Sequence, residues 1–167
     1  QSGHLIEPYL DTLCREIAET AALVREAGKR VQSVYIGGGT PTTLDEQQLT
    51  RLLKTLEQNF DFSRLREYTV EAGRPDTITP GKLHALRAAG VGRVSINPQS
   101  MDDKVLAAIG RRHAAADVLR AYDEARQAGF DAINMDVIAG LAGGTAETFA
   151  QTIDTLTGLA PKNITVH

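Results

Sequence analysis

Five short apolar segments alternate with amphipathic helical patterns along this chain, and this alternation constrains its fold more than any other feature. The apolar segments are rich in β-branched residues and end in glycine or polar residues, which is typical of strands in a buried sheet. We expect strands at Val31–Ile36, Tyr68–Glu71, Val91–Asn97, Ala132–Ile138 and Ile164–His167.

Apolar residues spaced three and four apart predict a helix before the first strand and helices in the connections that follow. The expected helices are Leu5–Ala27, Asp45–Phe60, Pro80–Ala89, Asp102–Ile109, Ala115–Ala128 and Thr145–Leu159. Strands separated by helices imply right-handed crossovers and a parallel sheet. We therefore predict one α/β domain over residues 1–167, with a sheet that is either closed as a barrel or open and doubly wound.

The composition excludes several classes of function. With 167 residues, 42% hydrophobic content and a net charge of −3, the chain is ordinary globular protein, and its scattered basic residues argue against a nucleic-acid partner. No apolar stretch approaches the roughly 18–20 residues of a membrane span. The single cysteine, Cys14, cannot form an internal disulfide, is expected to pack in the core and fits a cytoplasmic location. With His4, His84 and His113 it shows no metal-ligand spacing.

Polar residues follow or interrupt each predicted strand near its carboxyl end, where parallel α/β folds place their chemistry. In chain order these are Gly37–Pro41, Glu71, Asn97, Gln99, Asp136 and His167. Because the carboxyl ends of parallel strands share one edge of the sheet, we expect these residues to meet at a common rim and to bind a polar ligand.

Each of these residue types has a chemical use and a structural alternative. The glycine run lets the backbone approach a ligand closely, although it could also be a tight turn, and it matches neither familiar phosphate-binding loop. A carboxylate such as Glu71 in an apolar strand needs a partner, which is either a cationic ligand group or Arg74. Asp136 interrupts a buried strand in the same way. Gln99 suits hydroxyl recognition but could also cap a turn.

Arg111 and Arg112 follow Gly110 near the end of a predicted short helix. One guanidinium could hold a carboxylate through two parallel hydrogen bonds. Alternatively, either arginine is a cation favoured by the helix dipole at a carboxyl terminus.

Five ordered motifs together resemble the oxygen-independent coproporphyrinogen III oxidase family of radical S-adenosylmethionine enzymes. They cover nearly the whole chain and comprise Tyr35–Thr42, Thr69–Thr77, Ser95–Gln99, Ile109–His113 and Asn134–Leu141. The resemblance implies a parallel sheet from a partial (β/α)6, TIM-like barrel. It also implies a [4Fe-4S] cluster and S-adenosylmethionine as cofactors, a porphyrinogen whose propionates become vinyl groups, and an electron-donor protein.

The resemblance further implies which residues bind the cofactor. They are Gly38, Gly39, Thr40, Glu71, Gln99, Arg111 and Asp136. The glycine-rich segment and Glu71 would face the methionyl amino group, and Arg111 would pair with the methionyl carboxylate. Gln99 and Asp136 would hold the ribose hydroxyls. These roles agree with the charges, since an acid faces an ammonium and a guanidinium faces a carboxylate.

The chain departs from the family pattern in two places. Family members carry a Cys-x3-Cys-x2-Cys motif on the loop after the first barrel strand, and this chain has only Cys14. We expect these cysteines upstream of Gln1, so that this chain lacks the first strand, is inactive alone and self-associates through an exposed sheet edge near Val31. A C-terminal substrate region is also expected to be absent. Ala142 stands where the family usually has proline, which should alter that loop.

Other functions remain open on sequence alone. Relatives in the same family act as haem chaperones or methylate other substrates, and the cofactor-binding residues do not separate these activities from the oxidase. A third alternative is a nonenzymatic α/β ligand-binding module without a cluster.

Overall fold

All five predicted strands form, and they pair into one parallel sheet. The structure is a computed structural model that describes residues 3–167. The strands are β1 (Ser33–Ile36), β2 (Glu67–Gly73), β3 (Arg93–Gln99), β4 (Ala132–Val137) and β5 (Asn163–Val166). Their order in the sheet follows the chain, from β1 to β5. A doubly wound sheet reverses its strand order, so this arrangement confirms the barrel-like alternative, although the sheet is open.

The predicted helices are also confirmed, and none of their ends is shifted by more than one residue. They are α1 (Ile6–Glu26), α2 (Glu46–Asn59), α3 (Pro80–Ala88), α4 (Asp103–Ala108), α5 (Ala115–Gln127) and α6 (Ala146–Leu159). Short 3-10 turns at Gly3–Leu5, Pro41–Thr43 and Pro75–Thr77 were not predicted. Side chains fix several helix starts: Asp45 and Gln48 cap α2 reciprocally, and the Asp102 carboxylate accepts two amide hydrogens at the start of α4.

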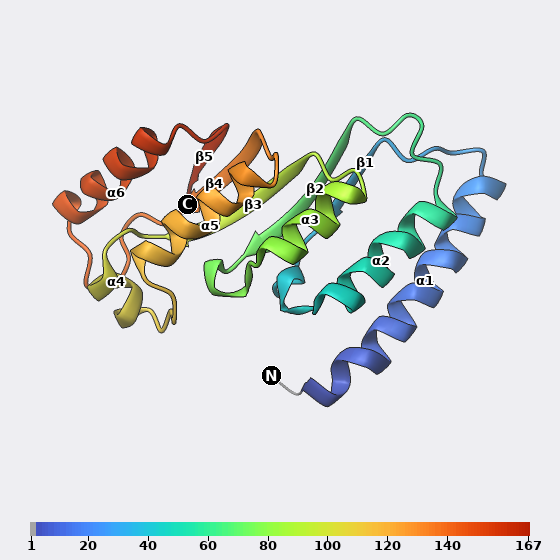
Figure 1. Ribbon diagram of the computed structural model, residues 1–167, viewed down its shortest axis with the longest axis horizontal. Helices are drawn as coiled ribbons and strands as arrows, with labels where there is room; N and C mark the ends of the chain where they lie inside the picture. The colour runs from blue at the N-terminus through green and yellow to red at the C-terminus, as the bar shows by residue number, and fades with distance from the viewer. Residues whose placement is uncertain (1–2) are drawn as a thin grey trace.

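Helices α2, α3 and α5 lie side by side in front of the sheet (Figure 1). Right-handed crossovers between consecutive neighbouring strands put every helix on the same face, because each crossover turns in the same sense. That face of the sheet is apolar. Val70, Ile96 and Met135, from β2, β3 and β4, are completely buried in the core between sheet and helices.

The opposite face of the sheet is polar, because successive side chains of a strand point to opposite sides. Glu71, Ser95, Asn134 and Asn163 occupy one row of register partners across β2, β3, β4 and β5. Buried parallel strands are usually apolar on both faces. This polar face is therefore the part of the fold that packing alone does not explain.

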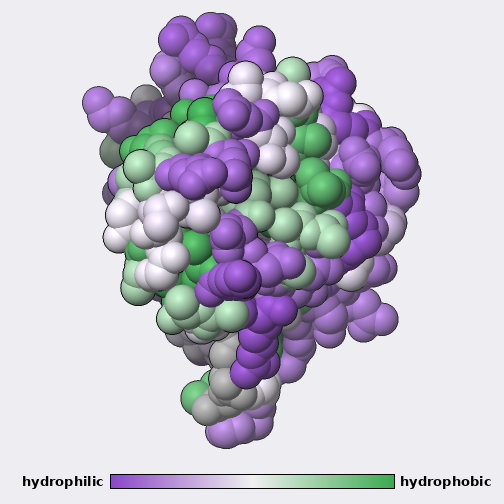
Figure 2. All heavy atoms as spheres, turned by 90° about the vertical axis from the view of Figure 1, so that its left-hand side faces the viewer, coloured by the Kyte–Doolittle hydropathy of each residue, from purple (hydrophilic) through white to green (hydrophobic). Residues whose placement is uncertain are grey.

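Strands β1 and β5 each pair with a neighbour on one side only. Figure 2 looks at the β5 and α6 end of the molecule and shows apolar atoms interspersed with polar ones on that surface. Val166 of β5 is 53% exposed there. Within residues 3–167, the search for a helix with the length and hydropathy of a membrane span finds none.

Candidate functional site

Glu71 lies half-buried on the polar face near the carboxyl end of β2. The Tyr35 hydroxyl donates a hydrogen bond to its Oε2 (3.3 Å), and Asn97 Nδ2 donates to its Oε1 (3.1 Å). Within the described part of the chain, Glu71 forms no ion pair with Arg74, so the structural partner considered from the sequence is replaced by two neutral donors. Among residues 3–167, Glu71 therefore has no cationic partner.

The glycine run follows β1 and passes directly over Glu71. A Cβ added to Gly37 would lie 3.1 Å from Glu71 Oε2 and would overlap the Tyr35 ring, so the backbone there comes closer than other residues allow. Gly38 has φ +102°, a conformation that favours glycine. Gly39 and Thr40 complete the turn, and the Thr40 carbonyl accepts hydrogen bonds from the Thr43 amide and hydroxyl. The loop thus brings its backbone close to the Glu71 carboxylate.

Gln99, at the end of β3, has two unusual features. Its φ is +66°, which is strained for a residue with a side chain, and the register with β4 shifts between Ile96 and Gln99. Its side chain is 8% exposed, and its Oε1 has no hydrogen-bond partner among residues 3–167. A buried unpaired amide oxygen is costly, so this atom is prepared for a donor that a ligand would bring.

Asp136 lies on β4, on the same face, with its side chain 21% exposed. Asn134 Nδ2 donates a hydrogen bond to Asp136 Oδ1, and His167 Nε2 is 3.8 Å from Asp136 Oδ2. Both carboxylates of the polar face therefore sit among neutral or basic groups.

Arg111 follows α4, and its side chain makes no hydrogen bond or ion pair with the described residues. A ring nitrogen of the buried His113 lies 3.2 Å from the Pro98 carbonyl oxygen and anchors this segment to the end of β3, beside Gln99. Arg111 is thus held near the strand ends with its guanidinium available. The exposed Arg112 follows it in the same segment.

The structure adds Ser95 and Asn134 to the rim residues expected from the sequence, which already included Asn97. Ser95, Asn97 and Asn134 are buried on the polar face and hydrogen-bond to one another or to its carboxylates. The signal was present in the sequence, because polar residues alternate with apolar ones in β3 and β4. Partial burial and the neighbouring Glu71 carboxylate raise the pKa of the Tyr35 hydroxyl, which therefore remains a donor.

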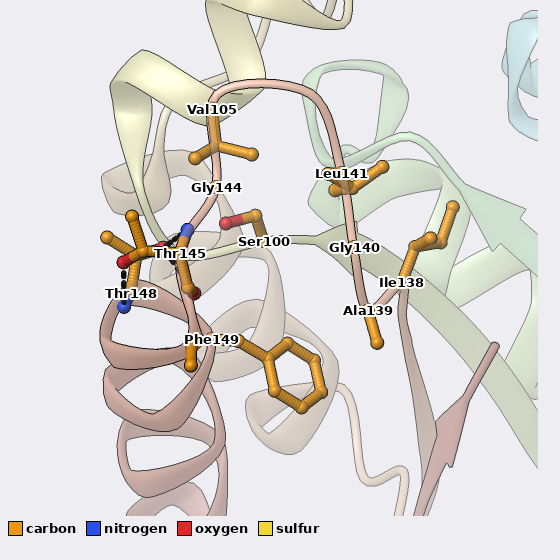
Figure 3. Close-up of a pocket in the computed structure, with 11 residues that line it drawn as sticks. Ser100, Val105, Ile138, Ala139, Gly140, Leu141, Gly144, Thr145, Thr148 and Phe149 are labelled. Atoms are coloured by element: carbon orange, nitrogen blue, oxygen red, sulfur yellow. Dashed lines mark hydrogen bonds between the residues drawn. The ribbon is translucent and has the colours of Figure 1, made fainter.

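Two cavities lie near the strand ends. One, of about 320 Å³, is bounded by the β4–α6 loop, α4 and α6; Figure 3 shows Ser100, Ile138 and Phe149 around it. None of the seven predicted site residues lines it, so it belongs to the helix layer. The other, of about 310 Å³, lies between α1 and the glycine loop and includes Gly39 and Thr40 in its lining. Ala142 lies in the loop of the first cavity, between turns at Gly140 and Gly143.

Residues 3–167 contain no group of three or more His, Cys, Asp or Glu side chains that could hold a metal ion. Cys14 lies half-buried on α1 and accepts a hydrogen bond from the Thr55 hydroxyl of α2 (3.4 Å). These residues do not fit an iron–sulfur cluster.

Comparison with known proteins places residues 6–156 in the radical SAM superfamily. The chain is 39% identical to the oxygen-independent coproporphyrinogen-III oxidase-like protein HemZ of Bacillus subtilis, matching 100% of this chain and 33% of that protein. It is 35% identical to the heme chaperone HemW of the same organism, over 97% of this chain and 42% of that protein. The structure matches coproporphyrinogen III oxidase (HemN) from Escherichia coli with a TM-score of 0.89 and 34% identity, covering 99% of this chain and 38% of that one.

Proposed function

This chain belongs to the radical SAM superfamily, and we propose that its polar sheet face binds S-adenosylmethionine in a protein of the oxygen-independent coproporphyrinogen III oxidase type. The chain spans about a third of the length of HemZ and HemN, the relatives that carry this name. The activity, substrate and partners of a whole protein are therefore part of this proposal.

The observation that carries the proposal is the buried, unpaired Oε1 of Gln99 at the carboxyl end of β3, the strand that lies between the strands of Glu71 and Asp136. S-adenosylmethionine offers an ammonium, a carboxylate and a ribose diol, and the site has a group for each. Glu71 beside the glycine loop would face the ammonium, and Arg111 would pair with the carboxylate. Gln99 and Asp136 would accept hydrogen bonds from the ribose hydroxyls.

The residues on this face would bind and orient the cofactor. Gly38 and Gly39 carry no side chain that would keep a ligand from their backbone. The Gly39 carbonyl accepts a hydrogen bond from the Thr40 hydroxyl, and the Thr40 carbonyl is bonded to Thr43. Asn97 and Tyr35 hold the Glu71 carboxylate from two sides, which leaves each oxygen one further acceptor site. The cofactor would thus meet a carboxylate whose orientation is fixed before binding.

S-adenosylmethionine and a [4Fe-4S] cluster are the cofactors of this family, and together they supply a carbon radical. The described residues offer no donor set for the cluster. We therefore propose that this chain is the central, cofactor-binding portion of a radical SAM domain, that the cluster cysteines lie on a preceding segment, and that the chain alone is catalytically inactive. A C-terminal substrate region and an electron-donor protein complete this proposal.

The proposed ligand is tested by titrating this chain with S-adenosylmethionine in a calorimeter. Glu71→Gln keeps the size of the side chain but removes its charge, so affinity should fall about tenfold or more, as expected for losing one charge-assisted hydrogen bond. Glu67→Gln is the matched control, because Glu67 lies on the same strand and face but pairs with Arg93 away from the glycine loop. Absence of binding by the unaltered chain would refute the proposed function.

The substrate needs a separate experiment, because the cofactor site is common to several activities. A longer protein that contains this chain, reconstituted with iron and sulfide without oxygen, should release CO2 from coproporphyrinogen III. The similarity to the heme chaperone HemW favours one alternative, haem binding without turnover. If the protein retains haem and releases no CO2, a chaperone activity takes the place of the oxidase activity in this proposal.

Two smaller proposals concern the surroundings of the chain. The unpaired outer sides of β1 and β5 offer backbone donors and acceptors, so we expect this chain to self-associate through a sheet edge. A monomeric mass by light scattering at high concentration would contradict this. A cytoplasmic location remains a prediction from the sequence.

A further inference from the structure

An uninterrupted line of side-chain hydrogen bonds joins the Glu71 and Asp136 carboxylates on the polar face. Asn97 Nδ2 donates to Glu71 Oε1 (3.1 Å), and the Ser95 hydroxyl donates to Asn97 Oδ1 (2.9 Å). Asn134 Nδ2 donates both to Ser95 Oγ (3.2 Å) and to Asp136 Oδ1. The line therefore runs from β2 through β3 to β4, across the proposed cofactor site.

The direction of these bonds is fixed by the groups around Asn134. Its Oδ1 accepts hydrogen bonds from Asn163 Nδ2 and from the Thr165 hydroxyl (3.2 Å), so its NH2 group must point toward Ser95 and Asp136. Ser95 has one hydroxyl hydrogen, which it donates to Asn97. At each end of the line an asparagine NH2 group consequently donates to a carboxylate, Asn97 to Glu71 and Asn134 to Asp136.

The middle of the line is shielded from water. Ser95 is 4%, Asn134 8% and Asn97 9% exposed. Buried polar groups that lose a partner are costly, because no water replaces it, and linked hydrogen bonds reinforce one another. The loss of one hydrogen bond in the line should therefore loosen the positions of both the Glu71 and the Asp136 carboxylate.

We propose that Ser95, Asn97 and Asn134 are positioning residues, which fix the spacing and orientation of Glu71 and Asp136 for a ligand with an ammonium at one end and a ribose at the other. This inference rests on the proposed function and deepens it. Ser95 is the central link, because it alone joins the half of the line on Glu71 to the half on Asp136. None of the three residues needs to touch the ligand.

The test is a double-mutant cycle on the affinity of this chain for S-adenosylmethionine, measured by calorimetry. Ser95→Ala should weaken binding about tenfold, because it removes both central hydrogen bonds. Glu71→Gln should then weaken binding less in the Ser95→Ala background than in the unaltered chain. The reason is that a carboxylate that is no longer held in position contributes less to the affinity. Such non-additivity is the signature of coupling, and a merely structural role would not produce it.

The matched control is Tyr122→Phe. Tyr122 is also buried, 6% exposed, but its hydroxyl lies in the helix layer, where it donates from α5 to the Leu159 carbonyl (2.7 Å). This variant should leave the affinity unchanged, and its effect should add to that of Glu71→Gln. Urea unfolding of each variant checks that it is folded. If Ser95→Ala does not fold, Asn97→Ala breaks the next bond toward Glu71 and serves in the same cycle.

The outcomes separate the two proposals. If the unaltered chain does not bind S-adenosylmethionine, the proposed function fails and this inference fails with it. If it binds, but Ser95→Ala binds equally well or its loss adds independently to that of Glu71→Gln, this inference alone is overturned.

Discussion

The two faces of the sheet are built from the same strands but have different roles, apolar packing on one and hydrogen bonding on the other. Ile96 and Ser95 are neighbours in β3, yet Ile96 is completely buried against the helices and Ser95 hydrogen-bonds across the opposite face. The helix-covered face stabilises the fold through apolar burial. The polar face contributes fixed hydrogen-bonding groups, which we propose bind the cofactor.

Each face also contains one buried oxygen without a partner in the described chain, and the contrast between them is instructive. Tyr68 points its hydroxyl into the helix-covered core, where it is 4% exposed and unpaired. Gln99 leaves its Oε1 unpaired at the carboxyl end of β3. Substitution of Tyr68 can remove its unpaired hydroxyl and so stabilise the fold. The unpaired oxygen of Gln99 would instead gain a hydrogen bond from the proposed ligand. Variants on the two faces should therefore affect different measurements.

The largest expected effect is on stability, from Ile96→Ala. Removing this side chain from a fully packed site should lower the free energy of unfolding in urea by about 3 to 4 kcal/mol. The adjacent change Ser95→Ala, on the other face, should cost about 2 kcal/mol, because it removes two hydrogen bonds and leaves their buried partners unpaired. If both variants lost the same free energy of unfolding, the proposed difference between the two faces would be contradicted.

A smaller effect, with opposite signs in two measurements, is expected from Gln99→Gly. Glycine accepts the positive φ of this position, so the free energy of unfolding should rise by about 1 kcal/mol. The affinity for S-adenosylmethionine should fall about tenfold, because the ribose loses an acceptor. Calorimetric titration and urea unfolding of the same preparation check both. A variant that is more stable and binds unchanged would remove Gln99 from the site.

The smallest effect is expected from Tyr68→Phe, which should stabilise the chain by about 1 kcal/mol at neutral pH because it removes an unpaired buried hydroxyl. Burial raises the pKa of Tyr68 from 10.0 to about 12. Between these values the unfolded chain releases the proton and the folded chain keeps it, so the unaltered protein loses stability as the pH rises through this window.

Urea unfolding at neutral pH and at pH values within that window checks this prediction. The Phe variant should lack this part of the alkaline loss, and its affinity for S-adenosylmethionine should not change. A weaker affinity would show that the two faces are not independent.

The sequence predicted the elements better than their ends. Strand β3 was predicted to end at Asn97, but it continues through Pro98 to Gln99. Pro98 cannot donate to the ladder, and the register with β4 shifts at this point, between Ile96 and Gln99. The same strand was expected to begin at Val91, but Gly92 instead belongs to the connection from α3, where its amide bonds to the Tyr68 carbonyl (3.0 Å).

The site was predictable in outline only. Strand ends and residue types pointed to Glu71, Gln99 and Asp136, because those carboxyl ends lie at one edge of a parallel sheet. Their partners were not identified, since the strands were read as apolar on both faces. Arg74 was considered for Glu71 because it is near in sequence, but contacts across the sheet bring Asn97 instead.

Because each strand lies next to the strand that precedes it in the sequence, the molecule is suited to assembly during translation. A newly synthesised βα unit can add to an existing edge as soon as it leaves the ribosome, without waiting for a distant part of the polypeptide. Local pairing of this kind shortens the search for native contacts and limits the time for which unpaired backbone is open to aggregation.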